Sequence, residues 1–210
     1  TGEYNRVLFW FHGLGDTADG WADLVPELNL EKTKYILPTA PIRPITLNGG
    51  MSMPGWSDIY GLDETSKEDL AGFNESAERV QAIVNQEISS GISASNIFIG
   101  GFSQGGALAL HYSLRSPLKL GGCIAFSSWL PFNKDYPSVL SDSSKTLPIV
   151  QVHGDNDYVV QFKWGSHTHK FLSEIITNPP PTFVKIPKHG HGFHPDETNI
   201  LKSFIVQYSK

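Results

Sequence analysis

Apolar residues along this chain follow two patterns that alternate from its beginning to its end. In short runs most positions are apolar, which is typical of strands buried on both faces of a parallel sheet. The predicted strands are 7–11, 35–37, 96–100, 122–126, 148–152 and 182–186. In longer stretches apolar residues recur every three or four positions, which indicates amphipathic helices. These predicted helices cover about 104–114, 162–176 and 197–208.

A further, longer helix is predicted between the second and third strands. Thr65-Ser-Lys-Glu68 has the form of a capping box, whose first and fourth side chains bond to the backbone at a helix start. One apolar stripe follows at helical spacing, formed by Leu70, Phe73, Ala77, Val80 and Val84. We therefore expect a helix that begins near Thr65 and ends before Gly91, a residue that commonly follows a helix end.

Strands that alternate with helices predict an α/β fold with a mostly parallel central sheet and helices on both faces. The 210 residues contain no Gly/Ser tract, charge block or internal repeat, so we expect a single domain spanning 1–210. In sheets of this kind ligands bind beyond the carboxyl ends of the strands. Residues with catalytic chemistry should therefore come directly after predicted strands.

Composition and charge narrow the possible function classes. A net charge of −5 offers no basic surface for a nucleic-acid backbone, and the longest apolar run, 7–11, is far shorter than the ~20 residues of a membrane span. The single cysteine, Cys123, excludes an internal disulfide and any zinc site with two thiolates from this chain. We expect a cytoplasmic protein with Cys123 as a core residue; no signal peptide is visible, although a chain starting at Thr1 can have lost a leader.

The strongest candidate for chemistry is Ser103. It lies in Gly101-Phe-Ser-Gln-Gly105, a G-x-S-x-G motif placed directly between a predicted strand and a predicted helix. The glycines allow the sharp turn that lifts a nucleophilic serine above the sheet edge. The helix N-terminus that follows favours negative charge at this point. The motif alone is weak, but its strand-turn-helix context predicts a nucleophile.

The acid of such a site should come next along the chain, and a histidine after it. The segment His153-Gly-Asp-Asn-Asp157 directly follows the strand 148–152 and offers two carboxylates. Aspartate is also a common turn residue, so spacing alone does not separate Asp155 from Asp157.

The candidate base lies in Lys188-His-Gly-His-Gly-Phe-His194, which follows the last predicted strand. A histidine there can act as a general base near neutral pH. On pattern alone His189, His191 and His194 all remain possible. A metal site built from the same three residues is the competing interpretation. We set it aside because no fixed carboxylate or thiolate set accompanies them and the serine motif would go unexplained.

Acyl transfer also needs hydrogen-bond donors aimed at the developing oxyanion. One donor is normally the backbone N–H of the residue after the nucleophile, here Gln104. The first strand ends at His12-Gly-Leu-Gly-Asp16, where glycines on either side of Leu14 allow its N–H to turn inward. We expect Leu14 and Gln104 to form the oxyanion hole, and His12 and His153 to shape the floor of the site.

Four motifs identify a family. They are His12-Gly-Leu-Gly-Asp-Thr17 with Trp21, Met53-Pro-Gly-Trp-Ser-Asp58, Gly100-Gly-Phe-Ser-Gln-Gly-Gly-Ala-Leu108 and Ser128-Trp-Leu-Pro131. Together they resemble the acyl-protein thioesterase/lysophospholipase group, in the phospholipase/carboxylesterase branch of the α/β-hydrolases. The resemblance runs over essentially the whole chain and implies an α/β-hydrolase fold. It also implies that the acid is Asp157, the last residue of an HGxxD pattern, and that the base is His191, six residues before Glu197.

The stretch 42–56 is long for a connection and rich in apolar residues, which favours contact with an apolar ligand. Gly49 and Gly50 give this stretch freedom to move. The family resemblance implies an acyl-chain groove here. The residues expected to line the groove are Ile45, Leu47, Met51, Met53, Trp56 and, from a later loop, Trp129.

These observations predict a serine hydrolase that needs no metal and no cofactor. The resemblance implies long-chain acyl thioesters on proteins, or lysophospholipid esters, as its substrates. A carboxylesterase acting on small short-chain esters is the nearest alternative, and a catalytically silent hydrolase-fold binding module is a more distant one. We expect a monomer or weak homodimer with no nucleic-acid partner and no transmembrane segment, which contacts membrane surfaces transiently.

Overall fold

The computed structural model describes residues 4–63 and 65–210 and contains a six-stranded sheet in the order β2-β1-β5-β6-β7-β8. Every pair of neighbouring strands in this sheet is parallel. The strands are β1 (Arg6–Phe11), β2 (Thr33–Ile36), β5 (Ile97–Phe102), β6 (Gly122–Phe126), β7 (Ile149–Gly154) and β8 (Thr182–Ile186). The predicted α/β fold with a parallel sheet is therefore confirmed, and each predicted strand lies within two residues of an observed one.

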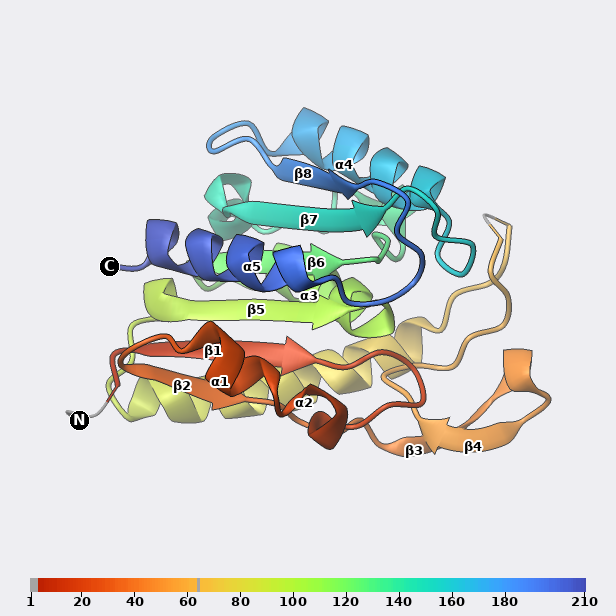
Figure 1. Cartoon of the computed structure of the whole chain (residues 1–210), viewed down its shortest axis with the longest axis horizontal. Helices are drawn as coiled ribbons and strands as arrows, with labels where there is room; N and C mark the ends of the chain where they lie inside the picture. The colour runs from red at the N-terminus through yellow and green to blue at the C-terminus, as the bar shows by residue number, and fades with distance from the viewer. Residues whose placement is uncertain (1–3, 64) are drawn as a thin grey trace.

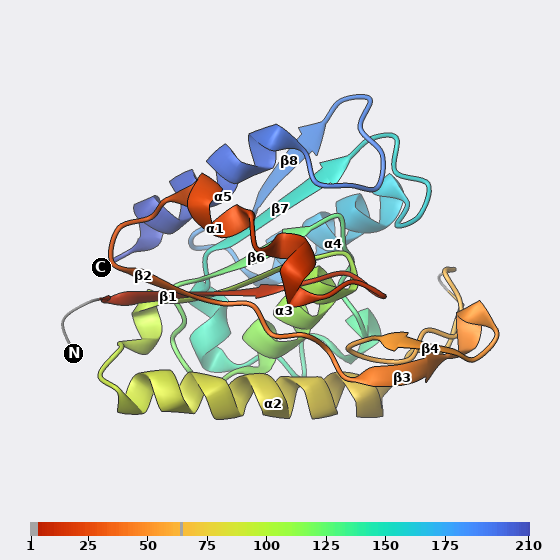
Figure 2. The same cartoon turned by 60° about the horizontal axis from the view of Figure 1, so that its bottom comes forward.

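Helices cover both faces of the sheet (Figures 1 and 2). On one face, α1 (Leu24–Leu28) and α5 (Pro195–Tyr208) bury their apolar side chains against the strands. On the other face, α2 (Leu70–Ser89), α3 (Gln104–Arg115) and α4 (Phe162–Ile175) do the same. Short 3-10 turns lie at Ala18–Trp21, Thr46–Asn48, Ala94–Asn96, Asn133–Asp135 and Asp142–Thr146. The sheet thus separates two hydrophobic cores.

The start of α2 differs from the prediction. Asp69 caps this helix by accepting a backbone N–H of its first turn at 3.0 Å, so the helix begins at Leu70. Thr65 instead donates its hydroxyl to Asp63, and Glu68 forms an isolated bridge with Ile59. The predicted capping box was wrong because the Thr65 hydroxyl bonds to Asp63 and the Glu68 carboxylate accepts the backbone N–H of Phe132 at 2.8 Å. The stripe of α2 is buried at Phe73, Val80 and Val84, whereas Leu70 is 43% exposed.

The stretch 42–56, expected as a long loop, contains a β-hairpin. β3 (Ile42–Ile45) pairs antiparallel with β4 (Met51–Pro54), and the turn between them includes Gly49 and Gly50 at φ of 66° and 81°. Most of the hairpin residues are exposed or half-buried, so the apolar alternation that marks a strand is missing. The hairpin lies beyond the arrowheads of the parallel strands in Figure 1, beside the edge where the candidate residues emerge.

Candidate active site

Ser103 lies in the turn between β5 and α3. Its backbone adopts φ of 55° and ψ of −122°, a conformation that residues with side chains rarely hold. A Cβ added to Gly105 would lie 2.0 Å from the carbonyl oxygen of Phe11, so the strand-to-helix turn requires glycine there. The turn lifts Ser103 to the N-terminus of α3, where the helix dipole favours negative charge.

Ser103, His191 and Asp157 form a continuous line of hydrogen-bonding contacts. His191 Nε2 lies 3.0 Å from Ser103 Oγ, and His191 Nδ1 lies 2.7 Å from Asp157 Oδ2. Because a carboxylate only accepts, Nδ1 carries the imidazole proton and Nε2 is available to accept the serine hydroxyl. The turns after β5, β7 and β8 bring together three side chains that sequence pattern and family resemblance had selected.

Asp157 is held as a buried carboxylate, 4% exposed. Its Oδ1 accepts the backbone N–H groups of Val159 and Val160 at 2.9 and 3.0 Å, and its Oδ2 also lies 3.5 Å from His153 Nε2. Burial by itself would raise the pKa of this carboxyl. The hydrogen bonds from His153 and His191 outweigh it and bring the pKa of Asp157 well below its usual range. The group therefore stays ionised beside the imidazole.

Asp155, the alternative acid, has different partners. Its Oδ1 accepts the backbone N–H of Lys188 at 2.6 Å, and its Oδ2 lies 3.4 Å from Lys185 Nζ. These contacts connect the turn after β7 to the loop after β8. Asp155 therefore supports the loop that carries His191 and does not contact its ring.

The three histidines of that loop point to separate partners. His189 Nε2 lies 2.8 Å from the carbonyl oxygen of Gly192, and His194 Nδ1 accepts the backbone N–H of Asp196 at the start of α5. His191 alone contacts the serine. In the described part of the chain no three His, Cys, Asp or Glu side chains are arranged to hold a metal ion.

His12 and His153 are both buried behind the site, 1% exposed each. His12 Nε2 accepts the backbone N–H of Ala40 at 3.0 Å, so its Nδ1 donates to the carbonyl of Gly13 at 2.6 Å. Burial lowers the pKa of His12, which keeps this ring neutral. His153 Nε2 lies 2.8 Å from the carbonyl oxygen of Val160. Both rings are hydrogen-bonded to backbone groups in or near the turns after β1 and β7.

Leu14 and Gln104 lie on the turns that follow β1 and β5. These strands are neighbours in the sheet and pair up to Phe11 with Gly101, so their turns emerge side by side. Gln104 is the first residue of α3, where backbone N–H groups have no acceptor within the helix. Leu14 precedes Gly15, whose φ of 80° turns the chain sharply.

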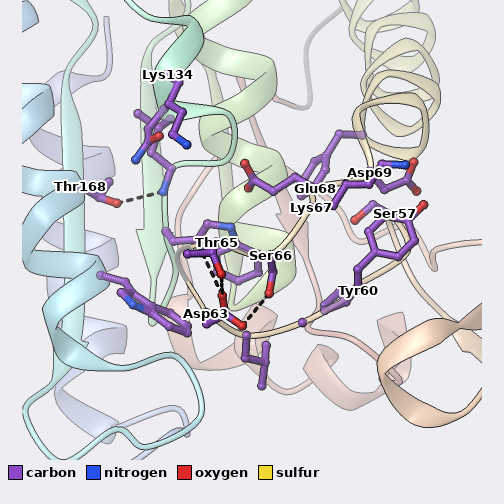
Figure 3. A pocket seen from close by; sticks show the side chains of 18 of the residues that line it. Ser57, Tyr60, Asp63, Thr65, Ser66, Lys67, Glu68, Asp69, Lys134 and Thr168 are labelled. Carbon is purple, nitrogen blue, oxygen red and sulfur yellow. Dashed lines mark hydrogen bonds between the residues drawn. The ribbon is translucent and has the colours of Figure 1, made fainter.

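A cavity of about 750 Å³ has Ser57 among its lining residues. The carbonyl oxygen of Ser57 accepts an N–H of Gln104 Nε2 at 2.9 Å, which links the cavity wall to the residue after Ser103. The walls are the segments 57–63 and 65–69, residues within 129–136, and one face of α4 (Figure 3). The apolar part of the lining includes Ile59, Leu62, Phe73, Trp129, Trp164 and Phe171. In Figure 3, Lys67 and Glu68 lie on one wall, across the cavity from Thr168.

This cavity differs from the groove expected along the stretch 42–56. Of the six residues named for that groove, Trp129 lines the cavity and the others do not. Ile45 is fully buried and Trp56 is 3% exposed, so both side chains belong to the hydrophobic core and do not line a surface groove. Leu47 and Met51 are exposed on the hairpin. Met53 is half-buried, and its sulfur accepts an N–H of the Asn48 side chain at 3.4 Å.

Sequence reasoning missed the cavity wall formed by α4. Trp164 and Phe171 are seven residues apart, which places them on the same helix face, and both line the cavity. That spacing was visible in the sequence. An amphipathic pattern does not show whether a residue on the apolar face packs on the sheet or lines a cavity.

No helix in residues 4–63 and 65–210 combines the length and apolar character that a membrane crossing requires.

Known proteins resemble this chain in sequence and in structure. The model of the phospholipase/carboxylesterase family matches residues 2–209. Acyl-protein thioesterase 1 of Mycosarcoma maydis is 38% identical, over 95% of this chain and 89% of the relative. Arabidopsis thaliana SOBER1 matches with a TM-score of 0.91 and 32% identity, over 97% of this chain and 98% of that chain. Zea mays acyl-protein thioesterase 2 matches with a TM-score of 0.90 and 28% identity, over 99% and 95%. The chain therefore belongs to the phospholipase/carboxylesterase family of α/β-hydrolases.

Proposed function

We propose that this chain is a serine hydrolase that cleaves long-chain acyl thioesters on proteins and, as a second substrate class, lysophospholipid esters. The observation that carries the proposal is the line of contacts from Ser103 Oγ through the His191 imidazole to the Asp157 carboxylate. Relatives named acyl-protein thioesterase 1, 34–38% identical, support the thioester as the bond that is cleaved.

The first half of the reaction forms an acyl-enzyme. Ser103 Oγ attacks the acyl carbonyl while His191 Nε2 takes the hydroxyl proton. The negative charge moves to the carbonyl oxygen, where the backbone N–H groups of Leu14 and Gln104 bind it. His191 then gives its proton to the leaving thiolate, or to the alkoxide of an ester, as the bond to the acyl carbon breaks.

The second half releases the acid. His191 takes a proton from water, the resulting hydroxide attacks the acyl carbon, and the proton passes to Ser103 Oγ as the acyl-enzyme bond breaks. Throughout the cycle the ionised Asp157 orients the imidazole and stabilises its charged form. These steps are balanced without a metal or a cofactor, and we propose none.

The apolar side chains in the cavity lining support a long acyl group as the substrate. Ser57, which lines the cavity, is hydrogen-bonded to Gln104, the residue after Ser103, and this link supports an acyl chain that enters the cavity while its carbonyl stays at Ser103. We therefore assign the acyl chain to this cavity, with Trp129 and Trp164 among its walls.

Exposed Leu47 and Met51 on the hairpin favour transient contact with a membrane surface, where acylated proteins and lysophospholipids reside. We propose a single cytoplasmic domain, acting as a monomer or weak homodimer. The shared sheet supports the single domain, because its strands come from both ends of the chain.

The direct test is hydrolysis of a palmitoylated peptide thioester by the wild type and by Ser103→Ala. The variant should lose about 10⁵-fold in kcat while keeping its circular dichroism spectrum. Near-normal turnover by Ser103→Ala would sink the assignment. A series of acyl esters of increasing length separates the alternatives: a preference for acetyl esters favours a small-ester carboxylesterase. A folded wild type that hydrolyses none of them favours a silent binding module.

A further inference from the structure

A short segment, Pro54–Ser57, connects the hairpin to the cavity and touches both turns of the proposed oxyanion hole. We call it the connecting segment. Its residues at positions 56 and 57 are almost fully buried, at 3% and 0% exposure, and Gln104 is 1% exposed. Hydrogen bonds in this region are therefore shielded from water, which makes each one strongly orienting.

On the side of β5, the Gln104 side chain holds the connecting segment. Its Oε1 accepts the backbone N–H of Trp56 at 3.0 Å. Its Nε2 donates to the carbonyl oxygen and the hydroxyl oxygen of Ser57 at 2.9 and 3.1 Å. The amide is thus satisfied from both ends, and the residue that carries one proposed oxyanion donor is fixed by its own side chain.

On the side of β1, the connecting segment holds the turn that contains Leu14. The Trp56 indole donates to the carbonyl oxygen of His12 at 2.8 Å, and the backbone N–H of Gly15 donates to the carbonyl oxygen of Pro54 at 2.8 Å. A Cβ on Gly55 would lie 3.1 Å from the Leu14 side chain, so the Gly55 backbone packs closely against that side chain. His12, two residues before Leu14, and Gly15, one residue after it, are therefore both hydrogen-bonded to the connecting segment.

We propose that the Gln104 side chain is a positioning residue: through the connecting segment it sets the two backbone N–H donors of the oxyanion hole at the correct separation. This inference rests on the proposed function. The two donors belong to different turns, and the strand pairing below them ends at Phe11 and Gly101. Beyond that point the connecting segment spans both turns with direct hydrogen bonds. Because catalysis is sensitive to displacements of about 1 Å, loosening this bridge reduces the rate of the chemical step.

The test uses Gln104→Met, which keeps the side-chain length and both backbone N–H groups but removes all three side-chain bonds. The matched control is Gln86→Met on the exposed face of α2. Both are assayed on acetyl and palmitoyl thioesters. We expect Gln104→Met to lose roughly 10- to 100-fold in kcat on both substrates, because every acyl group shares the carbonyl. KM should stay within about twofold, because the interaction is made only in the transition state.

A second measurement isolates the oxyanion. Alkyl trifluoromethyl ketones form a tetrahedral adduct with a nucleophilic serine, and the adduct places negative charge on oxygen. Their inhibition constant should rise in Gln104→Met by the same factor by which kcat/KM falls, while Gln86→Met changes neither.

A third variant covers the case in which Gln104→Met does not fold. Trp56→Phe leaves Gln104 intact and removes the indole bond to the His12 carbonyl together with part of a buried ring. It should show the same pattern with a smaller loss, and its melting temperature verifies that it is folded.

The outcomes separate this inference from the proposed function. A loss that appears in KM and grows with acyl length would mean that Gln104 only shapes the cavity, which overturns the inference. An active Gln104→Met or Trp56→Phe with wild-type kcat overturns it as well. A wild type without hydrolase activity contradicts the proposed function instead.

Discussion

The carboxyl edge of the sheet and the walls of the cavity are built in different ways. At the edge, backbone pairing extends directly into the functional turns. The N–H of Ser103 donates to the carbonyl of Phe126 at 2.8 Å, and that of Ser127 donates to the carbonyl of Val152 at 2.8 Å. The positions of the candidate side chains are therefore consequences of the strand register.

The cavity wall formed by 57–63 and 65–69 depends on side chains. Asp58 accepts the backbone N–H and the hydroxyl of Thr46 at 2.8 and 2.6 Å, and Asp69 accepts the N–H of Asp58 at 2.8 Å. Glu68 reaches across to accept the N–H of Phe132 at 2.8 Å. Each of these hydrogen bonds depends on one particular side chain and would be lost if that residue were replaced.

The difference teaches which property each region controls. An edge fixed by backbone pairing supplies a rigid reaction geometry, whereas a wall fixed by individual carboxylates can change from one sequence to another without altering that geometry. Substitutions at the edge should therefore affect the chemical step, and substitutions in the wall should affect the choice of substrate.

The sharpest challenge to this division is the pair Asp157→Asn and Asp155→Asn. Asparagine at 157 cannot hold the His191 Nδ1 proton as a carboxylate does, so kcat should fall on the order of 10³- to 10⁴-fold. Asparagine at 155 still accepts the Lys188 N–H, and kcat should change less than about threefold. Steady-state kinetics on one thioester measures both. Equal losses in the two variants would mean that the edge is sensitive to loop shape alone.

A smaller effect concerns stability, because the edge contains one carboxyl whose burial is unfavourable when charged. Glu197 is fully buried; one oxygen accepts the N–H of His194 at 2.7 Å and the other has no partner among the described residues. Burial raises the pKa of Glu197 from 4.5 to about 7. The folded protein therefore retains a proton that the unfolded chain releases, and stability should decrease as the pH rises from about 4.5 to about 7.

Glu197→Gln removes this titration. The difference in free energy of unfolding between about pH 5 and pH 8 should shrink by about 3 kcal/mol, as measured by urea denaturation. The matched control, Glu78→Gln on the exposed face of α2, should keep the wild-type pH dependence. An unchanged pH dependence in Glu197→Gln would show that this carboxyl is charged in the folded protein.

The cavity wall is tested by Trp129→Ala against Met51→Ala. Removing the Trp129 ring should lower kcat/KM for a palmitoyl thioester by roughly 10- to 100-fold and leave an acetyl thioester within about threefold. Met51 is 65% exposed on the hairpin and should change either value by less than about twofold. A loss of kcat/KM that is larger in Met51→Ala than in Trp129→Ala would mean that the acyl chain binds along the hairpin, as the sequence had suggested.

The smallest effect is expected at Cys123 in β6. Burial raises the pKa of its thiol to about 12, so the native protein should not react with iodoacetamide over hours, whereas urea-unfolded protein should react fully. Rapid alkylation of the native protein would show that β6 opens to solvent.

The same difference decides what the sequence could predict. Buried parallel strands appear in the sequence as apolar runs, and the turns after these runs lie at the carboxyl edge of the sheet. Ser103 and the loops of the acid and the base were therefore predicted from the apolar pattern. The choice of Asp157 over Asp155 needed the family resemblance. In the structure it depends on the two backbone N–H groups at 159 and 160, which no spacing rule encodes.

The cavity could not be predicted in the same way. Segment 57–69 has no periodicity, and its carboxylates compete for hydroxyls and N–H groups at several distances. The Thr65 hydroxyl bonds to Asp63 instead of capping a helix, and α2 begins several residues later than the sequence predicted. The bridge from Gln104 to Trp56 joins residues 48 apart, and nothing in the apolar pattern indicates it.

The central claim is that Ser103 is the nucleophile of a working hydrolase. Labelling with a fluorophosphonate probe, followed by mass spectrometry of the digested protein, tests this claim directly. We expect a single phosphonyl adduct on Ser103, formed rapidly in the wild type, slowly in Asp157→Asn and not at all in Ser103→Ala. An adduct on another residue, or a folded wild type that takes up no label, would contradict it.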